Sequence, residues 1–237
     1  MPTLKLTWQL RPRHQRPHQL ELSLLRLVMQ ILLASTSPRR RELLGLLGLS
    51  FHIVPPTSQE IFSPHLPPIE QTRELARDKA QSVANQYPQD LVIGSDTVIE
   101  IEGRLLGKPE NMQEAETMLR HLRGRRHQVH TGVAVIHQAT CVSIDFVETA
   151  QVWIKLFDET TLNAYLATKE SMGKAGAYSI QGKGAQLIEK VVGDYPTIVG
   201  LPLWRTAKVL EQQGVVLPTP VEDIYRVKPY PHWNDFS

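Results

Sequence analysis

The sequence has one cysteine, Cys141, and lacks long apolar runs. A single cysteine excludes an internal disulfide and a zinc site built from cysteines, and it is typical of a reducing compartment. The apolar runs are only a few residues long, far below the ~20 residues that a membrane helix needs, so no spanning segment is expected. A GxxxxGK[ST] loop and a GxGxxG turn that opens a helix are also missing, which excludes P-loop and Rossmann sites.

Excess charge of either sign is absent as well. The chain has 26 Lys and Arg and 24 Asp and Glu, a formal net charge of +2. Residues 1–28 hold five of the basic residues and one acid, so residues 29–237 keep 21 basic and 23 acidic residues and a charge of −2. A broad nucleic-acid-binding face is therefore not expected, and an anion site must be a local concentration of Lys and Arg.

The 237 residues, 41% of them apolar, suffice for a substantial hydrophobic core. Residues 1–28 show no clean secretory pattern, and Met29 stands directly before the first strong strand. We interpret residues 1–28 as a disordered extension or a mis-called start. Residues 29–214 are expected to form the folded domain, and residues 215–237 an irregular, Pro-rich C-terminal tail that is either packed or loose.

The apolar pattern predicts strands that alternate with helices. Strands are expected at residues 30–34, 51–54, 91–94, 97–101, 128–137, 141–157 and 186–192. Helices are expected at residues 38–47, 70–87, 112–123, 158–168 and 203–213. This order indicates an α/β fold with a mixed sheet.

The first expected strand leads directly into a helix that begins with Ser37 as N-cap and Pro38 as its first residue. Helix N-termini present unpaired backbone N–H groups and a partial positive charge. Ser35, Arg39 and Arg40 would add hydroxyl and guanidinium donors, so the segment is a candidate phosphate cradle. An ordinary capped helix with solvated arginines is an equally good interpretation.

Two further stretches carry charged groups where a core or a strand is expected. Lys79 falls on the apolar face of the helix at residues 70–87, so it must either extend to solvent or meet an anion. Asp96 is expected just past a strand, at the sheet edge where α/β folds gather ligands, although an Asp there is often only a turn former. Lys108 follows a short hairpin that would bring it near Asp96, and Glu60 could add a metal ligand. Taken singly, Lys108 and Glu60 are each more typical of surface residues.

A glycine-rich stretch at residues 173–184 surrounds Gln181. Glycines allow a backbone to approach a ligand closely, and a Gln side chain both donates and accepts hydrogen bonds, which suits the edge of a nucleobase. A mobile surface loop is the alternative.

Taken together, these short motifs resemble the Maf family of nucleoside triphosphate pyrophosphatases over about residues 29–213. The segments that carry the resemblance are STSPRR at 35–40, ARDKA at 76–80, GSDTV at 94–98, GKP at 107–109, KAGAYSIQG at 174–182 and VGLP at 199–202. The resemblance implies a two-lobed, ITPase-like α/β fold with an elongated mixed sheet flanked by helices and a central cleft. It also implies a homodimer in the cytoplasm and a divalent cation, Mg²⁺ or Mn²⁺.

The resemblance further implies roles for individual residues. Asp96 matches the general base, Glu60 its metal partner, and Lys79 and Lys108 the phosphate-binding lysines. Arg39 and Arg40 match phosphate-binding arginines, next to Ser35 and Ser37. Water would attack the α-phosphorus opposite these cations, with no covalent nucleophile.

At two positions the sequence resembles the branch of the family that acts on dTTP and UTP: Thr97, directly after Asp96, and Gln181. The branch that acts on 7-methyl-GTP has Gln directly after the Asp. The sequence leaves three alternatives: a 7-methyl-GTP or broad-specificity pyrophosphatase, a nucleotide-binding regulator of cell division, and a nucleic-acid-binding protein. The last needs a basic face that the charge of residues 29–237 does not supply.

Overall fold

The structure is a computed structural model that describes residues 29–63 and 65–236. The expectation for residues 1–28 lies outside this part of the chain.

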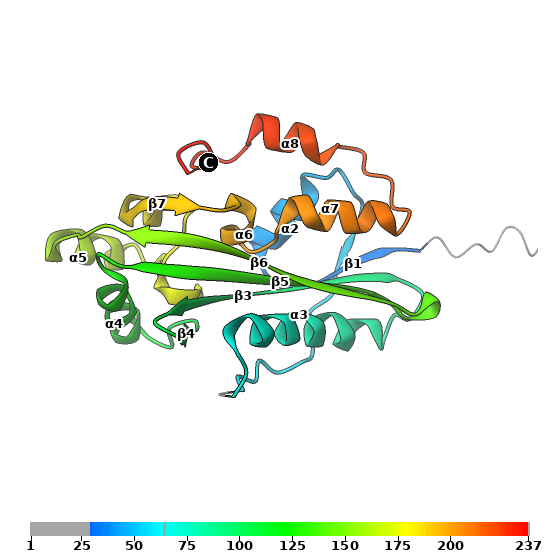
Figure 1. The fold of residues 1–237 in the computed structure, drawn as a ribbon, viewed down its shortest axis with the longest axis horizontal. Helices are drawn as coiled ribbons and strands as arrows, with labels where there is room; N and C mark the ends of the chain where they lie inside the picture. Colours follow the sequence, from blue (N-terminus) through cyan, green and yellow to red (C-terminus); the bar gives the residue numbers. More distant parts are fainter. Residues whose placement is uncertain (1–28, 64, 237) are drawn as a thin grey trace, which may run out of the picture.

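A long mixed sheet forms the centre of the molecule (Figure 1). The strand order is β2-β1-β3-β5-β6-β7, and β4 pairs with β3. β2, β1 and β3 run parallel, and every other pairing is antiparallel. The strands are β1 (Ile31–Ala34), β2 (His52–Ile53), β3 (Leu91–Ile101), β4 (Arg104–Leu106), β5 (Arg126–His137), β6 (Val142–Ile154) and β7 (Ile188–Val192). The expected α/β class with an elongated mixed sheet is confirmed.

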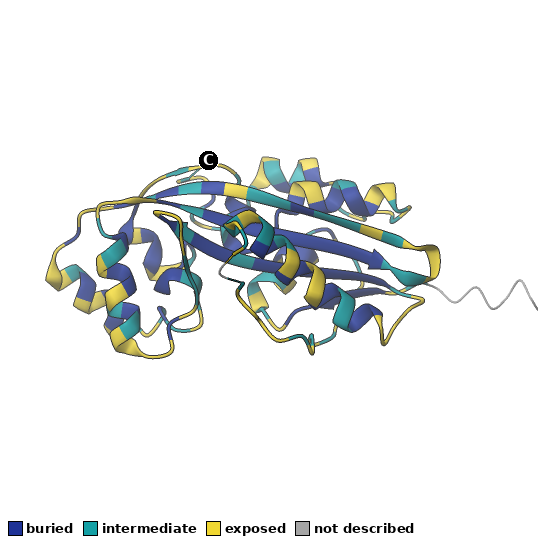
Figure 2. Cartoon of the chain, turned by 60° about the horizontal axis from the view of Figure 1, so that its bottom comes forward, coloured by how far each residue is buried: buried dark blue, intermediate teal, exposed yellow. Residues whose placement is uncertain are grey.

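Helices cover both faces of the sheet (Figure 1). One face carries α3, and the other carries α2, α6 and α7, with α8 outermost, while α4 and α5 lie at the far end of the long strands. The helices are α2 (Pro38–Gly45), α3 (Pro68–Ala84), α4 (Met112–Leu122), α5 (Glu159–Ala167), α6 (Tyr195–Val199), α7 (Leu203–Gln212) and α8 (Val221–Val227), and the 3₁₀ turns are η1 (Gln138–Thr140), η2 (Ala175–Ala177) and η3 (Gly182–Leu187). Figure 2 shows the buried residues concentrated along the sheet and the exposed ones on the outer helix faces.

Helix α3 packs unusually close to the sheet because glycines face it. A Cβ added to Gly94 would lie 2.5 Å from the Ala76 carbonyl oxygen and 2.6 Å from the Ala80 nitrogen. One added to Gly132 on the neighbouring strand β5 would lie 2.6 Å from the Thr72 carbonyl oxygen. These contacts fix the height of α3, and therefore of Lys79, above β3.

The expectation of two separate strands at residues 91–94 and 97–101 is wrong, because β3 runs without a break through both. One edge of β3 pairs with β1 as far as Gly94 and with β4 from Ile99 onward. Between them, residues 95–98 have no strand neighbour on that edge in the described part of the chain. Asp96 therefore lies within a strand, not past its end, and faces a gap between β1 and β4.

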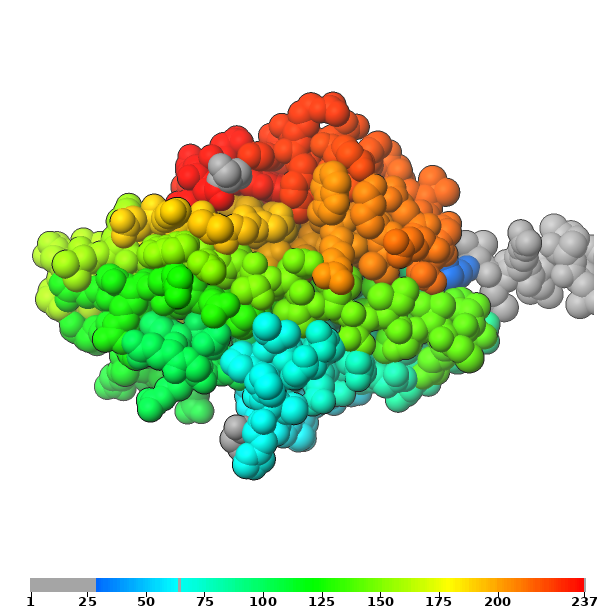
Figure 3. Space-filling model, viewed as in Figure 1, coloured from blue at the N-terminus to red at the C-terminus, as the bar shows by residue number. Residues whose placement is uncertain are grey.

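The expectation of an irregular C-terminal tail is also wrong for part of it. Residues 221–227 form α8, and Trp233 is buried. Figure 3 shows this segment lying directly on the residues of α7. The apolar residues of this C-terminal segment pack on the domain, although its sequence has no long apolar periodicity that would predict a helix.

Candidate active site

A cavity of about 540 Å³ opens at the gap between β1 and β4. All of the residues predicted from the sequence to form the site line it: Ser35, Ser37, Arg39, Arg40, Glu60, Lys79, Asp96, Thr97, Lys108 and Gln181. A volume of this size is within the range of small-molecule sites. The structure thus brings together segments from six separate parts of the sequence.

Lys79 joins the two carboxylates of the cavity. Its side chain is buried, and its Nζ donates to Asp96 Oδ1 and, over 2.8 Å, to Glu60 Oε1. Of the two alternatives for this lysine, the structure therefore shows an anion partner and not an extension to solvent. Lys108 Nζ also reaches Glu60, at 3.1 Å from Oε1 and 3.3 Å from Oε2.

The charge of Glu60 depends on these lysines. Burial disfavours its ionised form, but the hydrogen bond from Lys79 and the positive charges of Lys79 and Lys108 outweigh that effect and lower the pKa of Glu60 to about 2. Glu60 therefore remains a carboxylate at neutral pH.

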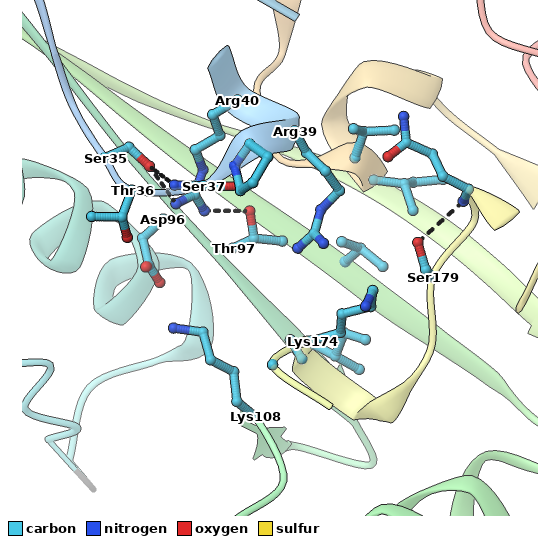
Figure 4. A pocket seen from close by; sticks show the side chains of 18 of the residues that line it. Ser35, Thr36, Ser37, Arg39, Arg40, Asp96, Thr97, Lys108, Lys174 and Ser179 are labelled. Atoms are coloured by element: carbon cyan, nitrogen blue, oxygen red, sulfur yellow. Dashed lines mark hydrogen bonds between the residues drawn. The ribbon is translucent and has the colours of Figure 1, made fainter. Parts of the chain in front are cut away.

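The two arginines at the start of α2 behave differently. Arg40 is bound inside the protein: Nε donates to the Gly200 carbonyl over 2.9 Å, and Nη2 donates to Thr97 Oγ1 over 3.1 Å. Arg39 points into the cavity (Figure 4), and burial lowers the pKa of its guanidinium. The motif RR predicted two equivalent anion-binding groups, but only Arg39 has its guanidinium free of hydrogen bonds to the described residues.

Ser35 and Ser37 form the turn that starts α2. Ser37 occupies the N-cap position as predicted, but its side chain makes no capping hydrogen bond. Its backbone nitrogen donates instead to Ser35 Oγ over 3.1 Å. Ser35 is buried, so its hydroxyl shapes the turn below the helix N-terminus.

The opposite wall of the cavity comes from the glycine-rich segment. Gln181 lines it, and its backbone nitrogen donates to Ser179 Oγ over 3.2 Å. Lys174 faces Arg39 across the cavity (Figure 4). Burial, and then the positive charge of Arg39, lowers the pKa of Lys174. Two cations that repel each other across an open space favour an anion between them.

Sequence reasoning gave no role to Lys174, Tyr178 or Thr131. Lys174 stands in the quoted KAGAYSIQG motif, so its charge was the available signal. Thr131 lies opposite Thr97 across β3 and β5, a pairing that no local pattern specifies. Tyr178 lines the cavity, and its hydroxyl lies 2.7 Å from Nε2 of His127, whose pKa burial lowers to about 4.

The charged residues around the cavity are unbalanced. Five are basic and two are acidic: Arg39, Arg40, Lys79, Lys108 and Lys174 against Glu60 and Asp96. This excess of positive charge is local, because the chain as a whole is close to neutral. The cavity is therefore suited to a ligand with several negative charges.

The carboxylates of the cavity also fit a divalent cation that is bound partly by the protein and partly by the substrate. Within the described residues, no group of three or more His, Cys, Asp or Glu side chains is placed to hold a metal ion. Glu60 and Asp96 supply two carboxylates, and Mg²⁺ is usually bound by one or two carboxylates together with substrate phosphates.

Comparison with known families identifies the chain. The model of the family described as "Maf-like protein" matches residues 30–213. The chain belongs to the Maf family. This match covers every residue of the candidate site and ends before α8.

Several curated relatives of this Maf protein share one name. "dTTP/UTP pyrophosphatase" of Pelotomaculum thermopropionicum is 46% identical over 185 residues, which are 78% of this chain and 97% of the relative. Proteins of the same name from a Thermoanaerobacter species and from Bacillus pumilus are 41% and 42% identical over 186 residues, with the same coverage.

Among solved structures, that of the Staphylococcus aureus Ham1 protein covers 68% of this chain and 80% of its own, with a TM-score of 0.42 and 16% identity. A TM-score this low carries no argument about function.

In the described part of the Maf chain, no helix is both long and apolar enough to cross a membrane.

Proposed function

We propose that this Maf protein is a nucleoside triphosphate pyrophosphatase that hydrolyses dTTP and UTP to the monophosphate and pyrophosphate. The observation that carries the proposal is the cavity itself, in which five basic and two acidic residues surround one space of about 540 Å³. The name shared by relatives at 41–46% identity supports the same substrates.

The reaction joins a water oxygen to the α-phosphorus and breaks the bond between that phosphorus and the oxygen bridging to the β-phosphorus. Asp96 accepts the proton of the attacking water, and the electron pair of the broken bond leaves with pyrophosphate. Asp96 is suited to this role because it lines the cavity and its side chain is held in place by the hydrogen bond from Lys79 Nζ. No covalent intermediate with the protein is needed.

The cations around the cavity stabilise the negative charge of the substrate and of the leaving group. Lys79, Lys108 and Arg39 would bind phosphate oxygens, and their fixed positions reduce the reorganisation needed as charge moves to pyrophosphate. Arg40 acts differently in this proposal: its hydrogen bonds to Thr97 and Gly200 hold the α2 start in place.

Glu60 and Asp96 would hold Mg²⁺ or Mn²⁺ together with the substrate. When bound, the cation supplies additional neutralisation of phosphate charge. The supporting observation is the chemistry of the donors, two carboxylates beside an open cavity. Removal of divalent cations with a chelator should abolish turnover, and adding back Mg²⁺ or Mn²⁺ should restore it.

Thr97 and Gln181 are proposed to select the pyrimidine. Both line the cavity, and a Gln amide can pair with the carbonyl and N–H groups that thymine and uracil share. Residues 29–214 are proposed as the catalytic domain, in accord with the family match at 30–213.

A panel of dTTP, UTP, CTP, GTP and 7-methyl-GTP in ¹⁸O-labelled water tests this function. We expect release of monophosphate and pyrophosphate from dTTP and UTP, with the label in the monophosphate, because attack is at the α-phosphorus. Preferred cleavage of 7-methyl-GTP, or equal cleavage of all five, would show that the assigned specificity is wrong. If no triphosphate is cleaved, the catalytic proposal fails and a nucleotide-binding regulator becomes the better account.

We also propose a cytoplasmic homodimer that does not bind nucleic acid. The lone cysteine and the near-neutral charge support the location and the absence of nucleic-acid binding. Light scattering of the purified protein should give twice the chain mass of 26.8 kDa. A mass equal to one chain would contradict the dimer.

A further inference from the structure

The C-terminal segment, residues 214–236, lies beyond the family match at 30–213 but is an integrated part of the fold. Its described residues include Val221, Ile224 and Trp233, which are all buried. The ring of Trp233 stacks on that of Tyr195, with centroids 5.5 Å apart and planes at 14°. Tyr195 is the first residue of α6, so this segment packs directly on that helix.

One hydroxyl group connects α8 to both neighbouring helices. Tyr225 Oη donates to Asp194 Oδ1 over 2.8 Å and accepts from the backbone nitrogen of Trp204 over 3.2 Å. The other oxygen of Asp194, Oδ2, caps α6 by accepting from the Thr197 nitrogen over 3.1 Å and from Thr197 Oγ1 over 2.9 Å. Tyr225 therefore holds the residue that caps α6.

From α6 the hydrogen bonds continue to the cavity. Thr131 Oγ1 donates to the Thr197 carbonyl over 2.7 Å, so its only proton is used there. Across the 3.0 Å between the two hydroxyls, Thr97 Oγ1 must then be the donor to Thr131 Oγ1. Thr97 Oγ1 in turn accepts from Arg40 Nη2 over 3.1 Å.

The end of α6 adds a second connection. The Gly200 carbonyl follows α6 and accepts from Arg40 Nε over 2.9 Å and from Ser95 Oγ over 2.9 Å. Arg40 is thus held twice by groups whose position depends on α6. Ile198 and Val199 of the same helix line the cavity directly.

We propose that Tyr225 is a positioning residue for the substrate cavity, which acts through Asp194 and α6 on Thr97 and Arg40. The role belongs to a segment outside the family match, so it is a property of this chain. Asp96, Lys79 and Lys108 do not take part in this chain of hydrogen bonds. This inference rests on the proposed function only because dTTP is the substrate used to test it.

The test compares Tyr225→Phe with Tyr230→Phe as a matched control. Tyr230 belongs to the same aromatic cluster, with its ring centroid 6.2 Å from that of Trp233, and its hydroxyl has no hydrogen-bond partner among the described residues. We expect Tyr225→Phe to raise KM for dTTP about three- to tenfold, the effect of losing one hydrogen bond of ordinary strength, with kcat within about twofold. Tyr230→Phe should leave both parameters unchanged.

Hydrogen exchange of the same proteins provides a readout that does not depend on turnover. In Tyr225→Phe, the amides of α6 should exchange faster, while those of α3 should not change. Asp194→Asn, which keeps only one acceptor oxygen where the carboxylate offers two to Thr197 and Tyr225, should also raise KM. A lowered Tm with unchanged KM would show that Tyr225 is only a structural contact and would overturn the inference.

Failure of the inference differs from failure of the proposed function. If the wild-type protein cleaves dTTP and Tyr225→Phe behaves like Tyr230→Phe, the inference is wrong and the function stands. If the wild-type protein cleaves no triphosphate, the function is wrong, and unchanged α6 exchange in Tyr225→Phe would overturn the inference independently.

Discussion

At the scale of the residue, the site depends on a few buried charges held by their neighbours. Lys79, on the apolar face of α3, is the clearest case because its ammonium group lies between Asp96 and Glu60. An unpaired ammonium group in that place would be strongly destabilising, and the carboxylates provide the compensation. The sequence predicted this choice between solvent and an anion, and the structure decides it.

The depressed pKa of Glu60 makes stability depend on pH. In the folded protein Glu60 titrates at about 2, and in the unfolded chain near 4.5, so the unfolded state binds more protons between these values. The stabilisation is present above about pH 4.5 and is lost as the pH falls toward 2. Thermal unfolding of Glu60→Gln between pH 6 and 2 should show a smaller decline in Tm than the wild type.

Glu74→Gln is the control for that profile, since Glu74 lies on the exposed face of the same helix, α3. Its Tm should follow the wild-type curve. If Glu60→Gln and the wild type decline equally, the ion pairs of Glu60 with Lys79 and Lys108 do not contribute as described.

Residue-scale prediction from the sequence was strongest where a charge stood in an unexpected place, as for Lys79 and Asp96. It was weakest where partners depend on tertiary pairing. Arg39 and Arg40 look alike in the sequence, yet Arg40 is bound to Thr97 and Gly200. Only the fold, which brings α6 against α2 and β5, distinguishes them.

At the scale of the element, the distance between α3 and the sheet positions Lys79 over Asp96. Gly94→Ala would place a Cβ 2.5 Å from the Ala76 carbonyl oxygen, so α3 must move. We expect a loss of about 1–3 kcal/mol in the free energy of unfolding, typical of an overpacked core, together with reduced turnover. Gly45→Ala is the control, because nothing lies within 4 Å of its added Cβ. Equal unfolding midpoints in urea for the two variants would contradict this account.

Most elements could be predicted because their apolar periodicity is strong. Helix α4 also begins with a capping hydrogen bond, in which Asn111 Oδ1 accepts from the Glu114 nitrogen. The short helices α6 and α8 were not predicted. Tyr195–Val199 has only five residues and begins with a Tyr-Pro pair, and Val221–Val227 sits in a Pro-rich segment. Both are stabilised by tertiary packing, such as that of Trp233 on Tyr195.

At the scale of the whole molecule, the sheet and its charges are organised around one cavity. The break between β1 and β4 along the edge of β3 leaves space for a ligand, and helices close both sides. The strand order and the gap between β1 and β4 depend on pairing between strands that are far apart in the sequence, so no local sequence pattern predicts them. The fold class was predictable from alternating elements, whereas the position of the gap was not.

Charge at the same scale separates a nucleotide site from a nucleic-acid face. Residues 29–237 carry a formal charge of −2, whereas the residues that line the cavity have an excess of basic over acidic side chains. We predict that a chain beginning at Met29 does not retard duplex DNA in a gel shift at about 150 mM salt. Retention of salt-sensitive DNA binding by that chain would contradict this prediction.

The most direct test of the central claim is the turnover of dTTP and UTP by Asp96→Asn, measured as monophosphate release with Mg²⁺. Asp78→Asn is the matched control, because Asp78 precedes Lys79 on α3 and is exposed. We expect kcat to fall by about 10²–10⁴ in Asp96→Asn, the usual contribution of a general base, and to stay unchanged in Asp78→Asn. Wild-type turnover by Asp96→Asn would show that Asp96 is not the base.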